Sequence, residues 1–220
     1  MGKRKVFCIG RNKTGTTSMA KAFRELGLVV ADQGVAELLL RDWARRDFRR
    51  IVLYCYTAQA FQDVPFSLPF TFQAVDQKFP GSKFILTVRD SPEQWYNSLI
   101  RFHAAKFGRN GRLPTIDDLE AATYVYRGWM YESTRLIRDI PADDPYNKDL
   151  LISHYNAHNN AVLEYFRRRP QDLLVLNVAE PSAYDKLCDF LGKPRMHKEF
   201  PWENRTADAQ TRQQRNSDNF

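Results

Sequence analysis

The chain has few cysteines and no pattern typical of a metal site. Its 220 residues include three cysteines, Cys8, Cys55 and Cys188, which lie far apart in the sequence. All three fall in apolar segments, so we expect buried thiols, and none has the spacing of a metal-binding cluster. This usage favours a reducing cytosol over a disulfide-linked secreted scaffold. We expect no metal cofactor.

Long hydrophobic runs are also missing. No apolar segment approaches the length that a membrane-spanning helix needs. The basic residues at positions 3, 4 and 5 precede only four apolar residues before Gly10, which is too short for a signal peptide. The sequence therefore predicts a cytoplasmic protein with no membrane partner.

Negative charge is the scarcer kind. Lys and Arg number 33 against 26 Asp and Glu, which gives a formal net charge of +7. An excess of positive charge favours an anionic ligand or a polyanionic partner, and a nucleotide is sufficient to explain some of it. Runs such as Arg167–Arg169 have the alternative interpretation of solvated helix ends. No nucleic-acid-binding module is recognisable, so we expect no nucleic-acid partner.

Strand-like and helical segments alternate along the chain. Residues 6–9, 84–88 and 173–178 are apolar throughout, as buried parallel strands are. We predict an α/β protein, a three-layer sandwich with a central parallel sheet and a P-loop-like nucleotide-binding loop. Residues 1–202 form the expected domain and 203–220 a polar tail. Short strands are also expected at 28–31 and 51–56, and residues 51–56 have a helical alternative. The other expected helices cover residues 35–48, 66–79, 92–103, 115–139, 147–169 and 181–191.

The segment 5–27 carries the strongest signal. An apolar run ends at Gly10, residues 11–18 contain no large apolar side chain, and helical periodicity begins at Met19. This order predicts a strand, a small-residue loop and a helix whose N-terminus favours a phosphate. Gly10 and Gly15 have the spacing of a kinase P-loop, but Thr16 stands where that motif has lysine.

The order Lys13-Thr14-Gly15-Thr16-Thr17 resembles the 5′-phosphosulfate loop of sulfotransferases that use 3′-phosphoadenosine 5′-phosphosulfate (PAPS). The resemblance implies that Lys13 contacts the oxygen that bridges phosphate and sulfate. It also implies that the loop binds the 5′-phosphate of the donor. The donor-binding residues expected in this loop are Arg11, Asn12, Lys13, Thr14, Gly15, Thr16, Thr17 and Ser18.

A second segment, 84–99, resembles the same family. A strand is followed by Arg89 and by a helix that carries Ser98, and the resemblance implies that this pair holds the 3′-phosphate of PAPS. The spacing between them is one residue longer than is usual in the family, so Ser91 is the alternative to Ser98. Near the C-terminus, Arg205 lies in a segment similar to the family's late loop and is a further candidate for the 3′-phosphate.

The group that removes the acceptor's proton has several candidates. Asp63, in an Asp-Val-Pro segment, is our first choice, and the family resemblance supports an acidic residue there. A turn or helix-capping role is its structural alternative. His103 is the second candidate. The polar run 154–159, which includes Tyr155 and His158, has two interpretations: it faces adenine or acceptor, or Tyr155 packs between helices with polar surface neighbours.

These signals predict an enzyme that transfers a sulfuryl group from PAPS to a hydroxyl, or an amine, of a small-molecule or carbohydrate acceptor by in-line displacement. Two alternatives stay open. One is a P-loop kinase for a small molecule, against which the position of Lys13 argues. The other is a nucleotide-binding protein without catalysis. The sequence does not identify the acceptor.

Overall fold

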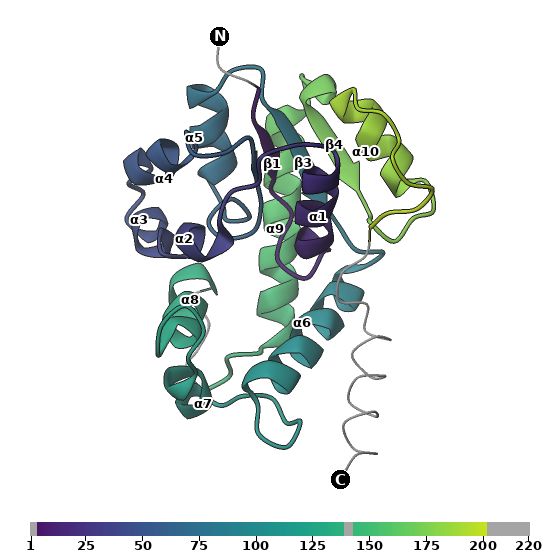
Figure 1. The fold of residues 1–220 in the computed structure, drawn as a ribbon. Coiled ribbons are helices and arrows are strands. Elements are labelled where there is room, and N and C mark those ends of the chain that lie inside the picture. Colours follow the sequence, from purple (N-terminus) through teal and green to yellow (C-terminus); the bar gives the residue numbers. More distant parts are fainter. Residues whose placement is uncertain (1–3, 139–142, 202–220) are drawn as a thin grey trace.

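A computed structural model describes residues 4–138 and 143–201 of the protein (Figure 1). Four parallel strands form its central sheet in the order β2-β1-β3-β4. The strands are β1 (Val6–Cys8), β2 (Ala60–Phe61), β3 (Lys83–Thr87) and β4 (Leu173–Leu176). The register pairs Phe7 with both Phe61 and Phe84, and Ile85 with Leu174. The expected parallel sheet is confirmed.

The side chains of β1 and β3 alternate between two hydrophobic cores. Val6, Cys8 and Ile85 point to one face, while Phe7 and Phe84 join the other. Successive side chains of a strand project to opposite faces, so an all-apolar strand must be covered on both sides. Helices α1 (Thr16–Glu25) and α10 (Ala183–Leu191) pack on the first face. The result is the three-layer α/β sandwich that the sequence predicts.

The larger core lies on the other face of the sheet. It takes side chains from α2 (Gln33–Glu37), α3 (Leu40–Ala44), α4 (Arg49–Tyr54), α5 (Thr71–Lys78), α7 (Ile116–Ala121), α8 (Trp129–Arg138) and α9 (Lys148–Phe166). Phe166 of α9 packs on Phe84, with ring centroids 4.7 Å apart. A short 3₁₀ turn, η1 (Pro170–Asp172), then leads into β4.

Helix α9 extends past the sheet and supports a second group of helices. Its first half packs against α6 (Pro92–Phe107) through Leu151 and Tyr155 on one side and Trp95 and Leu99 on the other. Residues 92–138 and 145–157, which we call the helical lobe, lie below the sheet in Figure 1. The lobe thus stands beyond the carboxyl ends of the strands.

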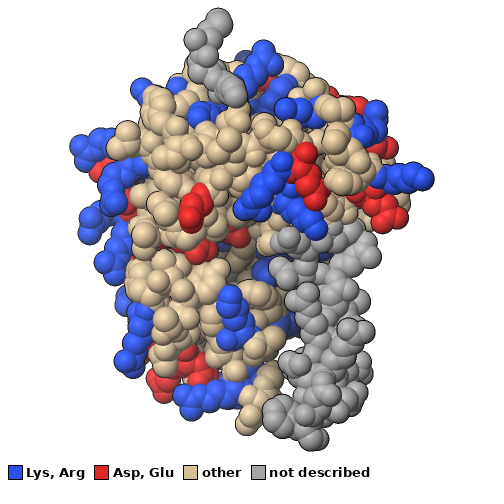
Figure 2. All heavy atoms as spheres, viewed as in Figure 1, with Lys and Arg blue, Asp and Glu red and all other residues tan. Residues whose placement is uncertain are grey.

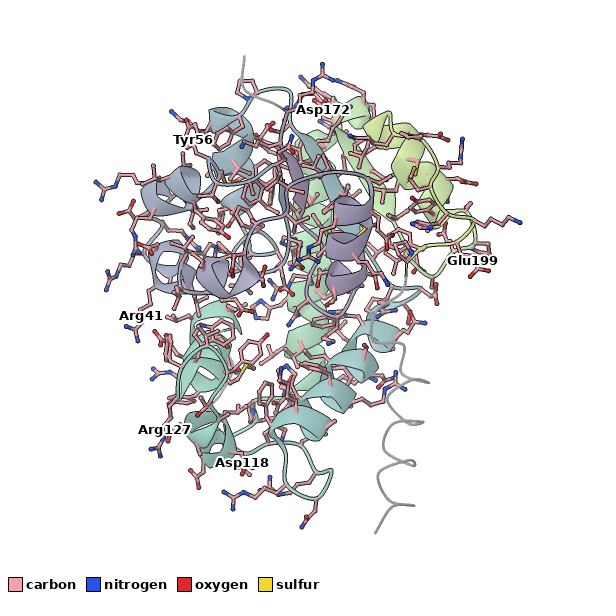
Figure 3. The ribbon with its side chains drawn as sticks, viewed as in Figure 1. Arg41, Tyr56, Asp118, Arg127, Asp172 and Glu199 are labelled. Atoms are coloured by element: carbon pink, nitrogen blue, oxygen red, sulfur yellow. The ribbon has the colours of Figure 1, made fainter. Side chains whose placement is uncertain are left out.

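An ion pair fastens the helical lobe to the helices beside the sheet. The Nε atom of Arg41 on α3 lies 2.5 Å from Oε1 of Glu132 on α8, and Figure 3 places Arg41 at the junction of these two helices. Asp118, labelled at the far end of the lobe, accepts from Thr115 in a capping box and pairs with Arg109 and Arg112. These contacts lie at the first turn of α7 and the first turn of α8.

One expected strand is wrong. Residues 51–56 fall in and just after helix α4, and Ile51 and Cys55 reach the core while Leu53 is 69% exposed. Positions 51 and 55 share a helix face, whereas a strand would also have buried Leu53. The actual strand at this edge, β2, has only two residues and gives no pattern that sequence reading can find. Residues 28–31 contribute only an isolated bridge from Val30 to Ala60.

Three expected helices are shorter or divided. The segment 35–48 is split between α2 and α3, and the segment 115–139 between α7 and α8, with Gly128 at a φ of 82° before α8. In the segment 66–79, α5 begins only at Thr71 because Phe70 has a left-handed backbone, with φ of 67°. The helices expected at 92–103, 147–169 and 181–191 are confirmed as α6, α9 and α10, with somewhat different ends. Ser91 caps α6, and Gly192 has a left-handed backbone at the end of α10.

Candidate active site

All four strands deliver polar residues to one edge of the sheet. The loop after β1 carries Lys13, the loop after β2 carries Asp63, and Arg89 and Asn177 follow β3 and β4. The connection after β1 runs to β2 on one side and the connection after β3 runs to β4 on the other, so the ends of β1 and β3 form a topological switch point. Open parallel sheets bind their ligands at such a point.

Two glycines let the first loop approach its neighbours closely. A Cβ atom on Gly10 would lie 2.1 Å from Oγ1 of Thr87, and one on Gly15 would lie 2.5 Å from Cγ2 of Val178. Gly15 also has a φ of 104°, which residues other than glycine rarely adopt. The loop is therefore pressed against the ends of β3 and β4.

The hydroxyl groups of the loop differ in their burial and in their hydrogen-bond partners. Thr14 is fully buried, and its hydroxyl lies 2.5 Å from the carbonyl oxygen of Arg11 and 2.6 Å from Oγ1 of Thr87. Ser18 is also buried. Thr16 donates to Asp63, and Thr17 is exposed at the rim of the pocket between the sheet and the helical lobe. Of the predicted loop hydroxyls, those of Thr16 and Thr17 line the pocket.

The N-terminus of α1 lacks a side-chain cap. Gly15, which has no side chain, occupies the cap position, and the first turn contains no acidic residue. The first backbone N–H groups of a helix have no partner within the helix. The N-termini of α6 and α9, in contrast, are capped by Ser91 and Asn147. The first turn of α1 thus offers donors and partial positive charge to an anion.

Lys13 projects from the loop into the pocket. Its backbone is left-handed, with φ of 67°, a conformation that costs energy for a non-glycine residue. Its Nζ atom lies 3.3 Å from the centroid of the Phe102 ring. Burial lowers the pKa of Lys13 to about 8, against the opposing effect of Asp63, and Arg89 and Lys106 lower it further. A cation whose pKa lies this close to neutrality is typical of a functional site.

Asp63 faces the same space from the next loop. Its φ is 56°, so it too has a left-handed backbone. Oδ2 accepts from Oγ1 of Thr16 at 3.0 Å, and Oδ1 accepts from the amide of Val64 at 2.9 Å. Burial raises the pKa of Asp63 above its ordinary value, while the bond from Thr16 and the charge of Lys13 oppose that rise. Two strained residues of opposite charge therefore meet over the end of the sheet.

Arg89 and Trp95 hold the loop in place. Nε of Arg89 donates to the carbonyl oxygen of Lys13 at 2.8 Å, and the indole N–H of Trp95 donates to that of Asn12 at 2.9 Å. Trp95 stacks on Tyr155, with ring centroids 4.6 Å apart, and the Tyr155 hydroxyl accepts from the amide of Arg89. Among the described residues, the terminal amino groups of Arg89 form no hydrogen bond, so they are available to a ligand.

The other predicted residues lie in different settings. Ser98 is half-buried two turns into α6, whereas the hydroxyl of Ser91 accepts from the amide of Gln94 as the helix cap. The Arg11 side chain is buried beneath the loop and donates to the carbonyl oxygen of Ser67. Arg205 and the predicted tail 203–220 lie outside the described residues.

The two histidine candidates differ in position. His103 is 3% exposed, lines the pocket and has Nδ1 2.9 Å from the hydroxyl of Tyr146. Nε2 of His158 lies 2.8 Å from the carbonyl oxygen of Ile9, at the end of β1. Burial lowers the pKa of His158 to about 3, so the ring is neutral and Nε2 donates to that carbonyl. His158 therefore ties α9 to β1 and lies outside the set of described residues that line the pocket.

A cavity of about 260 Å³ joins these elements. The face drawn in Figure 2 is hollowed between the sheet and the helical lobe below it. Asn12, Lys13, Thr16, Thr17, Asp63 and His103 line the cavity together with Glu37, Lys106, Tyr124, Trp129, Ser133 and Thr134. Sequence reasoning gave the polar members of the second group no role, because they lie on α2, α6, α8 and the segment between α7 and α8 without a motif that would place them at the site.

The described residues hold no group of three or more His, Cys, Asp or Glu arranged to bind a metal ion. None of the helices in the described part of the chain has the length and apolar character required to cross a bilayer. The three cysteines are free and buried.

The sandwich, with polar residues at the carboxyl ends of its strands, defines an α/β protein that has a polar pocket at the N-terminus of helix α1. A family model described as a sulfotransferase domain matches residues 5–209. The chain therefore belongs to the sulfotransferase family, and family membership supports a transferase that moves sulfuryl groups. No curated protein matches the chain in a sequence search.

Proposed function

We propose that the protein transfers the sulfuryl group of PAPS to a hydroxyl group of a small acceptor. The observation that carries this proposal is the meeting of Lys13 and Asp63 in one pocket at the uncapped N-terminus of α1. An anion-binding helix end, a cation and a carboxylate are the three elements that an in-line transfer from an anionic donor requires.

The phosphates of the donor match the anion-binding groups available at this edge of the sheet. The first turn of α1 and the hydroxyls of Thr16 and Thr17 would hold the 5′-phosphate, and the open amino groups of Arg89 the 3′-phosphate. Arg89 already bonds to the backbone of Lys13, so the two phosphate sites are mechanically linked. The forked guanidinium suits a phosphate because it presents parallel donors.

Lys13 and Asp63 would have separate roles in the transfer. The acceptor oxygen attacks sulfur and gives its proton to the carboxylate of Asp63. The bond from sulfur to the bridging oxygen breaks, and its electron pair stays on the 5′-phosphate of the nucleotide. Negative charge grows on that oxygen, where the ammonium of Lys13 stabilises it. The raised pKa of Asp63 makes its carboxylate a better proton acceptor.

The bisphosphate product, 3′-phosphoadenosine 5′-phosphate, tests the donor assignment. A ligand that binds only the folded state raises the melting temperature more as its affinity increases. We expect the bisphosphate to stabilise the protein more than ADP does, because only the bisphosphate carries the phosphate that Arg89 would bind. Arg89→Ala should remove most of that difference, whereas Arg24→Ala, at the other end of α1, should preserve it.

The reaction itself is read by mass. PAPS is supplied with a panel of alcohols, and the expected product gains one sulfuryl group while the bisphosphate is released in equal amount. Equal stabilisation by ADP and the bisphosphate would overturn the donor assignment. Transfer of phosphate from ATP in a magnesium-dependent assay would instead support the kinase alternative.

A further inference from the structure

Glu37 is a buried carboxylate that faces the reaction pocket. It stands at the end of α2, is 8% exposed and lines the same cavity as Lys13 and Asp63. No ion pair to Glu37 exists among the described residues, and the hydroxyl of Tyr124 reaches its Oε1 at 3.3 Å. A buried carboxylate without a cation loses hydration that few contacts replace. Such a group at a pocket wall is a candidate for binding a ligand.

The charge of the pocket bears on this residue. Burial and the nearby charge of Asp63 raise the pKa of Glu37 to about 7, although hydrogen bonds from Gln33 and Tyr124 and the charge of Lys106 oppose the rise. Glu37 therefore has strong acceptor capacity and incomplete charge near neutral pH. A donor group on a ligand would supply the hydrogen bond that water provides to an exposed carboxylate.

The wall formed by α8 is also rich in hydrogen-bond acceptors. The hydroxyls of Ser133 and Thr134 both donate to the carbonyl oxygen of Met130, at 2.9 Å each, so their protons are already engaged. Their oxygen lone pairs remain available, and both residues line the cavity. Together with Glu37, this wall suits a ligand that carries several donors.

A cationic ligand fits the pocket less well than a neutral one. The amino group of Lys13 occupies the face of Phe102, and that of Lys106 lies 4.4 Å from the centroid of Tyr124. These rings are the aromatic faces that would otherwise attract an ammonium group. A ligand cation would meet these two lysines as well as the carboxylates of Glu37 and Asp63, whereas a hydroxyl group can donate to Glu37 without adding charge to the pocket.

We propose that Glu37 positions the acceptor by binding a second hydroxyl group, and that the acceptor is a neutral polyhydroxylated ring compound. This inference rests on the proposed sulfuryl transfer and specifies its acceptor. One hydroxyl lies toward Asp63 for transfer, and another donates to Glu37. The aromatic side chains of Phe107 and Trp129, which also line the cavity, cover the apolar parts of the ring.

The test compares three probes that share one ring: cyclohexanol, cis-1,4-cyclohexanediol and myo-inositol. Binding is measured by calorimetry on the full chain, with and without 3′-phosphoadenosine 5′-phosphate. We expect the better of the two polyols to bind at least tenfold more tightly than cyclohexanol. Glu37→Ala should remove this preference, while Glu37→Gln, which keeps an acceptor oxygen, should retain part of it.

Glu120→Ala is the matched control, because Glu120 is exposed on α7 and does not line the cavity. It should keep the full preference. Equal binding of all three probes, or a preference that survives Glu37→Ala, would overturn the proposal. So would tighter binding of 4-aminocyclohexanol, which would identify a cationic acceptor. Bisphosphate affinity is read separately, so a failure of the donor assignment is distinguishable from a failure at Glu37.

Discussion

At the scale of single residues, Lys13 combines a strained backbone with a lowered pKa. Its left-handed φ of 67° turns the side chain into the pocket, where its amino group covers the ring of Phe102. Strain of this kind persists only where surrounding contacts impose it. Here the imposing contacts include the bond from Arg89 to the carbonyl oxygen of Lys13. The position of one ammonium group thus depends on several loops.

The charge of Lys13 is predicted to act on the transition state more than on donor binding. Lys13→Met keeps a stem of similar length and removes the ammonium. We expect single-turnover sulfuryl transfer with saturating donor to slow about a hundredfold or more, close to 3 kcal/mol. Donor affinity, measured by calorimetry, should change far less because the α1 amides and Arg89 remain.

Lys21→Met is the control for Lys13→Met, since Lys21 lies on α1 but does not line the pocket. Its transfer rate should match that of the unmodified protein. If Lys13→Met loses donor affinity and keeps its single-turnover rate, Lys13 is a phosphate anchor and its catalytic assignment is wrong.

At the scale of elements, the β1–α1 turn depends on a glycine that touches the end of β4. Gly15 and Gly27 both have positive φ, at 104° and 76°, but a Cβ atom on Gly27 would meet nothing within 4 Å. Comparing substitutions at Gly15 and Gly27 therefore separates the cost of backbone strain from the cost of a steric clash. At Gly15 the clash is with Val178, which lies just beyond the strand end.

Gly27→Ala is expected to lower the free energy of unfolding by about 1–2 kcal/mol, the cost of a left-handed alanine. Gly15→Ala should cost about 1–3 kcal/mol more, because the side chain of Val178 must also move. Chemical denaturation measures both values. Adding Val178→Ala to Gly15→Ala should recover part of the additional loss, and equal costs at the two glycines would contradict the predicted clash.

At the scale of the whole molecule, the candidate site exists because the loops that follow the four strands all begin at one edge of the sheet. Lys13 and Asp63 are 50 residues apart in sequence and lie on the loops after adjacent strands. The helical lobe closes the opposite wall of the pocket with residues of α6 and α8. The charges of Lys13 and Asp63 therefore affect each other's pKa within the candidate site.

This coupling predicts a bell-shaped dependence of kcat/KM for the donor on pH. Asp63 must be ionised to accept a proton, so activity falls as the pH drops through its raised pKa. Lys13 must be protonated, and its pKa is about 8, so activity falls as the pH rises above that value. The optimum should lie between these two limits, and steady-state kinetics over a range of buffers measures it.

Substitutions test which residue's titration produces each limb of the pH profile. Asp63→Asn should lower kcat at least about a hundredfold and leave the residual rate without the acidic limb. Lys13→Arg should move the alkaline limb to higher pH, because guanidinium stays protonated. An unchanged alkaline limb in Lys13→Arg would show that another group titrates there, and Glu37→Gln tests whether Glu37 contributes to the acidic limb.

The sequence by itself determined the fold class, the three longer strands and the β1–α1 loop, because these depend on local patterns of apolar and small residues. It also identified Lys13 and Arg89, which lie in segments that resemble the family's donor-binding motifs, and Asp63, which was chosen from the family resemblance of its Asp-Val-Pro segment. It failed at residues 51–56 and at β2, where a short apolar run carries no distinguishing period and tertiary packing selects the conformation.

Only the tertiary structure decided how those residues are used. Thr14 turns inward to Thr87 and Thr16 outward to Asp63, a difference that two neighbouring threonines cannot reveal in sequence. Glu37 and the α8 wall enter the pocket because α2, α3 and α8 pack into one hydrophobic core. Contacts between residues this far apart in the chain have no local signature, since their energy arises only when the chain has folded.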